Sequence, residues 1–138
     1  MDSAGLDRRT FLPLQDFDHV VQSVEVIFNR RLGETIMLRH FASGLPDLLG
    51  RAITPTLIAR YKSLLALAIN TWEPRLRVAL VSLAGNSASA VTLGELRFTI
   101  FVRYRPRALS GDFTPEAGLR RIGYAAREKT ITVEAVAT

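Results

Sequence analysis

The clearest structural signal in the chain lies at residues 54–83, which read TPTLIARYKSLLALAINTWEPRLRVALVSL. Apolar residues recur at steps of three and four through the first two-thirds of this stretch, a spacing that predicts one amphipathic helix. Thr54 is a suitable N-cap and Pro55 a first-turn proline, while Pro74 disfavours helical geometry at the residue before it. We therefore predict a helix over residues 55–72 that ends in a sharp corner.

Two strands are predicted after this corner. Residues 76–83 are apolar with only weak alternation, which favours a strand buried on both faces. Residues 96–104 alternate apolar and polar side chains, as in a half-exposed strand. The connection at 85–90 is small and polar, and such connections join antiparallel neighbours. The two strands are therefore expected to form a hairpin.

A second helix is predicted nearer the N-terminus. Apolar side chains recur at helical spacing over residues 17–32. Asp16 precedes them as a candidate N-cap, and Arg30 and Arg31 fall in the expected last turn, where cations favour the helix dipole. Residues 35–38 then predict a short extended piece.

The chain divides by pattern into three parts. Residues 1–13 are expected to form an N-terminal arm, residues 14–104 the main domain, and residues 105–138 a C-terminal extension punctuated by proline and glycine. The extension ends in a β-branched run at 130–136, a strand that pairs either with the domain's own sheet or with another chain. The predicted fold class is α+β, with two main helices packed on a small, mostly antiparallel sheet and a C-terminal arm ending in a strand.

Composition limits the classes of function. The 138 residues are 48% apolar and contain no cysteine, so one ordinary domain is expected without disulfides, thiolate metal sites or a cysteine nucleophile. No apolar run approaches the length of a membrane span, so no membrane partner is expected and the cytoplasm is the default location. The net charge of the chain is +5. All but two of the 18 basic residues are arginines, which suit bidentate contacts with carboxylates or phosphates. These arginines are spread over every predicted element and the aromatic residues are few, so no nucleic-acid partner is expected.

Residues with catalytic potential are sparse. His19 and His40 lack ligand spacing, so no metal and no cofactor are expected. Glu73 beside Trp72 suggests the general acid of a glycosidase, but no second carboxylate stands out. Arg75, two positions away, would pair with Glu73 and keep it ionised, whereas a general acid must carry a proton. No catalytic residue is therefore predicted. The Glu73 and Arg75 pair is either a lock at the helix end or a docking point, and its chemistry favours the lock.

Four short motifs occur in order around the long helix. They are Gln22-Ser23-Val24, Arg31-Leu32-Gly33-Glu34-Thr35-Ile36-Met37, Phe41-Ala42-Ser43-Gly44-Leu45 with Asp47-Leu48-Leu49, and Trp72-Glu73-Pro74-Arg75. In this order they resemble the small baseplate wedge proteins of contractile phage tails, whose relatives also occur in type VI secretion and other contractile injection systems. The resemblance covers about residues 14–104, which it identifies as a baseplate wedge domain. The chain departs from the family pattern at Ala42, often a glycine there, and in its longer tail after Tyr104.

The resemblance implies a structural role without catalysis. The protein would occur in multiple copies in the hexagonal baseplate of a virion tail, assembled in the host cytoplasm. Its partners would be baseplate wedge proteins, the sheath protein, and hub or tail-tube proteins. It would anchor on wedge helices and initiate the sheath by strand pairing, with the strand at 96–104 acting as a sheet edge protected by charge. The expected partner-binding residues are Trp72, Glu73, Pro74, Arg75, Arg97, Thr99, Phe101, Arg103, Ile131 and Val133.

Two alternatives stay open at this point. Relatives of this kind are sometimes labelled lysozyme-like, which suggests a tail-associated cell-wall hydrolase; such an enzyme would degrade peptidoglycan and lose that activity in Glu73→Gln. The third interpretation is a basic nucleic-acid-binding module, whose affinity for nucleic acid would fall steeply as the salt concentration rises.

Overall fold

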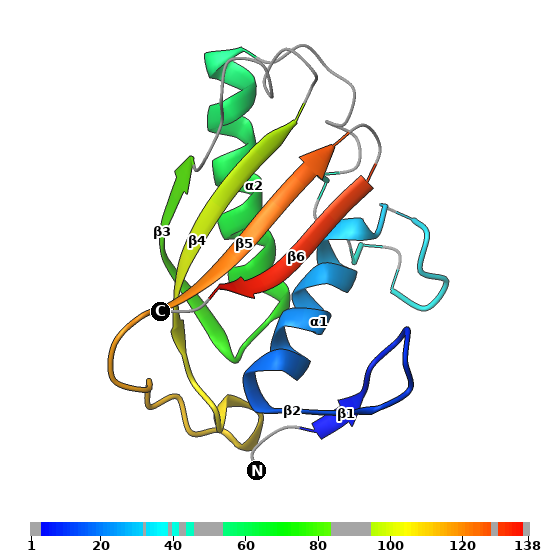
Figure 1. The fold of residues 1–138 in the computed structure, drawn as a ribbon, viewed down its shortest axis with the longest axis vertical. Helices are drawn as coiled ribbons and strands as arrows, with labels where there is room; N and C mark the ends of the chain where they lie inside the picture. Colours follow the sequence, from blue (N-terminus) through cyan, green and yellow to red (C-terminus); the bar gives the residue numbers. More distant parts are fainter. Residues whose placement is uncertain are drawn as a thin grey trace.

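The structure is a computed structural model and describes residues 4–31, 33–38, 40–41, 44–45, 54–83, 95–127 and 130–136. Its described part forms a four-stranded antiparallel sheet with two helices packed on one face, together with a small two-stranded sheet near the N-terminus (Figure 1). The predicted α+β class is therefore confirmed. In chain order the elements are β1 (Ala4–Leu6), β2 (Pro13–Gln15), α1 (Asp16–Asn29), α2 (Pro55–Trp72), β3 (Leu76–Leu83), β4 (Leu96–Tyr104), the 3₁₀ helix η2 (Ala108–Ser110), β5 (Arg120–Arg127) and β6 (Thr130–Val136).

Helix α2 has the predicted bounds. The Thr54 hydroxyl accepts a hydrogen bond from the Leu57 backbone N–H at 3.1 Å, which caps the first turn. At the other end the Glu73 N–H donates to the Ile69 carbonyl, after which Glu73 turns to an extended conformation. The proline at position 74 explains this stop, because the residue before a proline avoids helical geometry.

Helix α1 differs from its prediction at both ends. The predicted N-cap at Asp16 is wrong, because Gln15 holds the cap position and Asp16 is the first residue of the helix, with a left-handed φ of 51°. The helix ends at Asn29, so the prediction that Arg30 and Arg31 lie in its last turn is also wrong. The reason is a local turn, in which the Glu34 carboxylate accepts from the Arg31 N–H at 2.9 Å. The predicted extended piece at 35–38 is instead a turn, with bends at residues 35–37 and a hydrogen bond from the Leu38 N–H to the Thr35 carbonyl.

The sheet is a meander in the order β3-β4-β5-β6, with every neighbouring pair antiparallel. The predicted hairpin of β3 and β4 is confirmed, although its connection at 85–90 lies outside the described residues, as does the Asp47-Leu48-Leu49 motif. The predicted strand at 130–136 is β6, and of its two possible partners it takes the domain's own sheet, pairing with β5. Strand β5 was not predicted, because arginines at its start and Gly123 obscure the alternation of its buried residues.

Two predictions about strand environment are wrong. Strand β4 is not an edge, since β3 and β5 pair with its two sides and the sheet edges are β3 and β6. Strand β3 is not buried on both faces, because Leu80 is 59% exposed. A β-bulge between Val78 and Leu80 shifts the register there, so that an apolar side chain reaches the exposed face and the alternation in the sequence is weakened.

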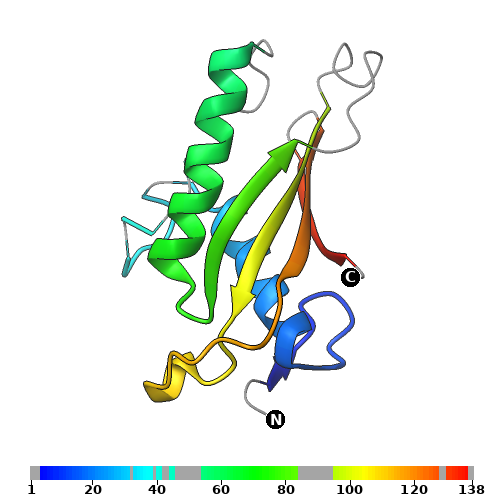
Figure 2. The same cartoon turned by 90° about the vertical axis from the view of Figure 1, so that its left-hand side faces the viewer.

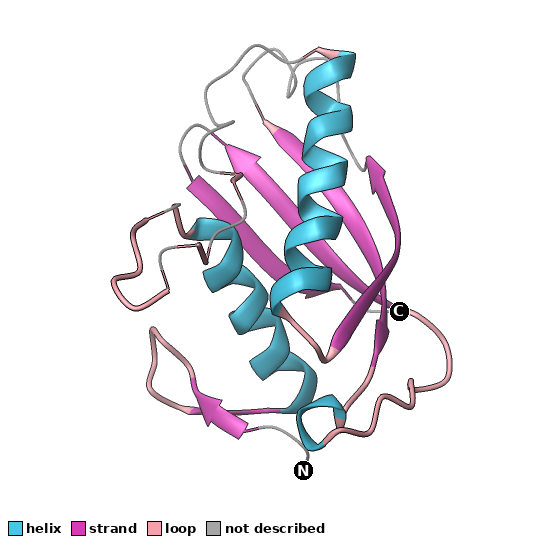
Figure 3. Cartoon of the chain, turned by 180° about the vertical axis from the view of Figure 1, so that it is seen from behind, coloured by secondary structure: helices cyan, strands magenta, loops and turns pink. Residues whose placement is uncertain are grey.

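The core lies between the sheet and the two helices. Seen from behind, both helices lie in front of the sheet (Figure 3), with α2 beside β3 (Figure 2) and α1 over β6. The rings of Tyr61, Phe98 and Tyr124 pack together, and Phe28 meets Tyr124 edge to face at 5.6 Å between ring centroids. Burial raises the pKa of both tyrosines. The opposite face of the sheet carries no helix in the described part of the chain.

The N-terminal hairpin of β1 and β2 is tied to α1 by Gln22 and by an ion pair between Arg9 and Glu25. The Gln22 side chain accepts from the Arg8 N–H at 2.8 Å and donates to the Leu6 carbonyl at 3.0 Å. Gly5 faces the ring of His19 so closely that a Cβ there would lie 2.4 Å from Nε2, which explains a residue without a side chain at this position. The hairpin is thus fixed to the helix through side-chain to backbone bonds and this ion pair.

Candidate functional site

Residues 72–75 form a corner that joins α2 to β3, and we call them the Trp72–Arg75 corner. Glu73 is 3% exposed and Arg75 is 5% exposed, although both have polar, ionisable side chains. The Arg75 guanidinium donates from Nε to one Glu73 carboxylate oxygen at 2.7 Å and from a terminal nitrogen to the other at 2.9 Å. A bidentate pair of this kind has a fixed geometry, which sets the angle between the helix and the strand.

Helix α1 completes this buried pair. The Ser23 hydroxyl accepts from Arg75 at 3.1 Å, and the His19 Nδ1 lies 3.4 Å from another guanidinium nitrogen. His19 and Ser23 are four residues apart and therefore share one face of the helix. Sequence reasoning missed both contacts, although Ser23 stands in one of the motifs and the spacing to His19 was a usable signal. The corner therefore connects α1, α2 and β3, as the lock interpretation expects.

The start of the C-terminal segment also meets the corner. The Arg105 N–H donates to the Arg75 carbonyl at 2.7 Å, and the Arg105 side chain donates to the Pro74 carbonyl at 2.8 Å. These bonds satisfy backbone oxygens that the sharp turn would otherwise leave unpaired. Residues on both sides of position 104 thus build one corner.

A shallow apolar hollow lies beside the buried pair. Its volume is about 320 Å³, and its wall includes Trp72 and Phe41, whose rings meet edge to face at 4.9 Å between centroids. Val26 and Ile27 of α1 line the other side, and Glu73 is at its base. The hollow gives the corner a surface that an apolar side chain of another protein would fit.

The ten residues expected to bind partners fall into three groups. In the corner, Trp72 is half-buried and Pro74 exposed, while Glu73 and Arg75 are enclosed. The four from β4 share the sheet face that carries no helix, and they are Arg97, Thr99, Phe101 and Arg103. Ile131 and Val133 of β6 point into the core, so their side chains are not on the surface.

The two sheet edges differ in regularity. Strand β3 is bulged, and the Asn70 side chain of α2 accepts from its Val78 N–H at 3.1 Å. Strand β6 keeps an unbroken register with β5 over all seven residues. Near its start the Asn29 side chain lies within 3.4 Å of the Ile131 carbonyl, so Ile131 turns its backbone oxygen away from β5. A regular edge accepts a further strand more readily than a bulged one.

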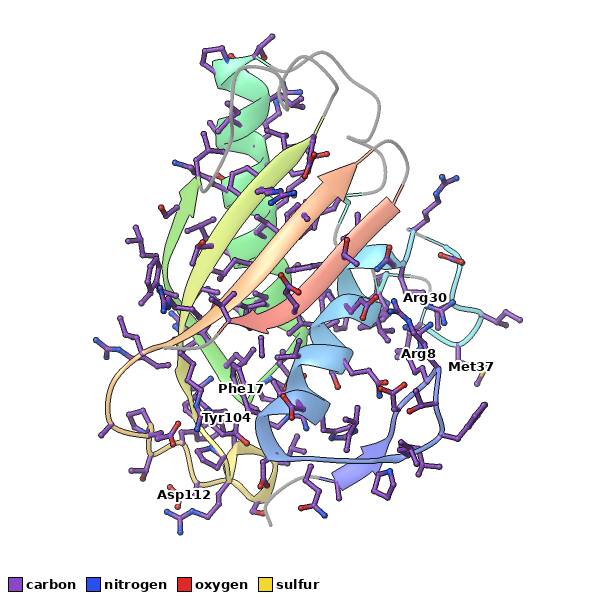
Figure 4. All side chains as sticks on the ribbon, viewed as in Figure 1. Arg8, Phe17, Arg30, Met37, Tyr104 and Asp112 are labelled. Atoms are coloured by element: carbon purple, nitrogen blue, oxygen red, sulfur yellow. The ribbon has the colours of Figure 1, made fainter. Side chains whose placement is uncertain are left out.

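A second arginine and glutamate pair lies at the same end of the sheet. Arg120 binds both carboxylate oxygens of Glu116, at 2.8 and 2.9 Å, and its guanidinium lies over the rings of Phe17 and Tyr104. Those two rings meet at 5.3 Å between centroids (Figure 4). The hydrogen bonds from Arg120 hold the pKa of Glu116 below its usual value, and the same bonds raise the pKa of Arg120.

The corner is poorly suited to acid catalysis. Both Glu73 carboxylate oxygens accept hydrogen bonds from Arg75, which occupies the atoms that a general acid would turn to its substrate. Within the described residues, histidine and acidic side chains form no cluster of three or more that would hold a metal ion. No helix in the described part of the chain is long and apolar enough to cross a membrane.

Comparison with known proteins agrees with this geometry. The family described as baseplate wedge protein gp25 matches residues 15–108. Baseplate protein W of Escherichia phage P2 is 28% identical over 89 residues, which cover 64% of this chain and 77% of that protein. Among solved structures, a baseplate chain of post-contraction pyocin R2 superposes with a TM-score of 0.58 at 24% identity, covering 74% of this chain and 98% of that chain.

A Geobacter sulfurreducens protein described as a candidate tail lysozyme has the same fold. Its TM-score is 0.59 at 22% identity, and the match covers 81% of this chain and 90% of that one. At this identity the likeness establishes the fold alone.

The fold and the matched family define a baseplate structural domain. The chain belongs to the baseplate wedge protein gp25 family, since the match spans more than half of its length. It is therefore a structural component of the baseplate of a contractile tail.

Proposed function

We propose that this baseplate protein initiates the sheath by accepting a sheath strand at the free edge of β6. The observation that carries the proposal is the regular register of β6, which is the edge of the four-stranded sheet that has no bulge. Strand addition gains affinity from backbone hydrogen bonds, so an added strand requires an even row of outward-pointing N–H and C=O groups. On β6 the Asn29 side chain meets the first of these groups, the Ile131 carbonyl, so the row available to a partner begins beyond it. The proposal replaces the β4 edge expected from the sequence.

The Trp72–Arg75 corner is proposed to anchor the domain on wedge helices. The apolar hollow beside Trp72 and Phe41 supports this role, because a helix with one apolar side chain would fit it. Glu73 and Arg75 then act from beneath the surface, by fixing the wall of the hollow, while Trp72 and Pro74 touch the partner. In this arrangement residues 14–104 supply the anchor and residues 105–138 supply the edge for the sheath.

One assembly experiment tests both parts. The protein is expressed with the neighbouring tail proteins, and the particles are purified and imaged by electron microscopy. Ala135 has the same strand parity as Ile131, so its N–H points away from β5, and Ala135→Pro removes an edge donor without breaking the ladder to β5. Ala135→Ser is the matched control, because it keeps the N–H.

We expect Ala135→Pro baseplates to form but to lack sheath, and Ala135→Ser particles to be complete. Val26→Glu places a charge in the hollow and is expected to keep the protein out of the baseplate, whereas Ala59→Glu on the exposed side of α2 is expected to have no effect. Normal sheath on Ala135→Pro particles would contradict the edge proposal, and normal incorporation of Val26→Glu would contradict the anchor.

A further inference from the structure

The sheet face that carries no helix is rich in arginine. Six side chains define it here as the open face, and they are Arg77 and Leu80 of β3, Arg97, Phe101 and Arg103 of β4, and Arg121 of β5. The sheet lies in front of both helices in Figure 1, so this face is turned toward the viewer. It uses side chains of the sheet surface and is distinct from the backbone edge of β6.

Two of these arginines oppose each other directly. Arg77 and Arg103 are cross-strand partners in the register of β3 and β4, and both are exposed. Like charges in directly opposite positions destabilise a sheet. Neither arginine forms an ion pair with another described residue, so no salt bridge in the described part of the domain offsets the repulsion. A binding partner that brings negative charge would offset it.

An apolar pair lies next along the same two strands. Leu80 faces Phe101 across the ladder, and Leu80 is 59% exposed. The bulge in β3 is what turns Leu80 to this face, since without it the residue parity would direct Leu80 to the helices. Arg121 is the partner of Phe101 on its other side, so basic groups flank the apolar pair.

Among the described residues, the acidic groups on this face are fewer than the basic ones. Glu95 pairs with Arg97 at 2.5 Å, and Glu134 of β6 is exposed. Between them lies a hollow of about 400 Å³ where Gly123 presents no side chain. A Cβ at Gly123 would lie 3.1 Å from a methyl carbon of Val136, so a larger residue there would crowd the hollow. The face is thus basic, partly apolar and indented.

We propose that the open face binds an acidic protein surface with an apolar centre, contributed by another tail protein. Arginine guanidinium groups bind carboxylates in bidentate geometry, and the pair of Leu80 and Phe101 matches the apolar centre. A nucleic acid fits less well, because Phe101 is half-buried within the sheet surface and offers no stacking platform for successive bases. This inference does not depend on strand pairing at β6.

The test is a binding titration of the ¹⁵N-labelled full chain followed by NMR. The probe is the peptide Gly-Glu-Leu-Glu-Phe-Glu-Gly, and its matched control carries glutamine in place of each glutamate. Arg103→Glu is the test variant, because it turns the like-charge pair with Arg77 into an opposite-charge pair. Arg60→Glu, an equal charge change on the exposed side of α2, is the control variant.

We expect the glutamate peptide to shift amide signals of β3, β4 and β5, and the glutamine peptide to leave them unchanged. Arg103→Glu should weaken binding by roughly tenfold while raising the melting temperature, and Arg60→Glu should retain wild-type binding. Unchanged spectra with the glutamate peptide, equal binding of the glutamine peptide, or full binding by Arg103→Glu would each overturn the proposal. Tighter binding of a short DNA duplex to the same face would overturn it in favour of a nucleic-acid surface.

Discussion

Two arginine and glutamate pairs at the same end of the sheet have the same hydrogen-bond pattern and opposite surroundings. Arg75 and Glu73 are 6% and 4% exposed in their side chains, whereas Arg120 and Glu116 are 39% and 40% exposed. Both pairs are bidentate between their side chains, and the lengths of these side-chain bonds do not distinguish them. The Arg75 backbone N–H adds a longer bond to Glu73, at 3.2 Å. The two pairs differ in their access to water. When one partner of the enclosed pair is removed, the other is left as a charge that solvent cannot reach.

The largest effect is expected for Arg75→Met. The substitution leaves the Glu73 carboxylate enclosed without its partner, and breaking a buried pair in this way costs about 3–5 kcal/mol. Urea unfolding, followed by circular dichroism, measures the loss in free energy of unfolding. The double variant Glu73→Leu with Arg75→Met should lose much less, because no charge is left behind. A loss below about 1 kcal/mol in the single variant would mean that water reaches the corner.

A smaller effect is expected for Arg120→Met. The exposed pair contributes up to about 1 kcal/mol, and the stacking of the guanidinium on Phe17 and Tyr104 adds a similar amount. Methionine keeps part of the contact with the rings, so the loss in free energy of unfolding should be about 1 kcal/mol. The same urea titration compares the two arginines directly. A loss equal to that of Arg75→Met would show that solvent exposure does not determine how much each pair contributes to the free energy of unfolding.

The smallest effect is the pH dependence of the exposed pair. Because the pKa of Glu116 is lowered in the folded protein, its contribution is present above the ordinary value of 4.5 and is lost as the pH falls through the lower folded value. Wild type should therefore exceed Glu116→Gln in melting temperature at neutral pH, and the gap should close in acid. Thermal melts across this range measure it, and added salt should narrow the gap at neutral pH. A gap that persists in acid would assign the effect to packing.

The elements predicted best are those whose sequence signals are local. Helix α2 has its cap at Thr54 and its stop at Pro74 within the same stretch of chain, so its bounds followed from nearby residues. Strand β4 shows strict alternation, and its bounds were also predicted. The helix signal of α1 was clear, but the helix ends earlier than predicted because Glu34 forms a turn there. Such a turn differs from a further helical turn by only one or two hydrogen bonds, so the sequence does not decide between them.

The features missed depend on distant parts of the chain. The position of β4 inside the sheet required β5, whose arginines and Gly123 concealed its pattern. The bulge that exposes Leu80 arises from the pairing of β3 with β4 and has no marker in β3 alone. At the candidate site the sequence singled out Glu73 and Arg75, whereas the contribution of His19 and Ser23 needed the packing of α1 against the corner. Local pattern therefore located the pair but did not establish its surroundings.

The contact between α1 and β6 has a consequence for synthesis of the protein. The Asn29 side chain reaches the Ile131 carbonyl across 102 residues of sequence, and much of the α1 apolar face packs on that strand. The four strands pair only with their neighbours along the chain, so the hairpins are able to close early at low loop entropy. Helix α1 is translated before β6, so the part of its packing surface that β6 supplies is missing until residue 136 has left the ribosome. During elongation its apolar side chains are exposed, and we expect chaperones to bind residues 17–28 until β6 has been synthesised.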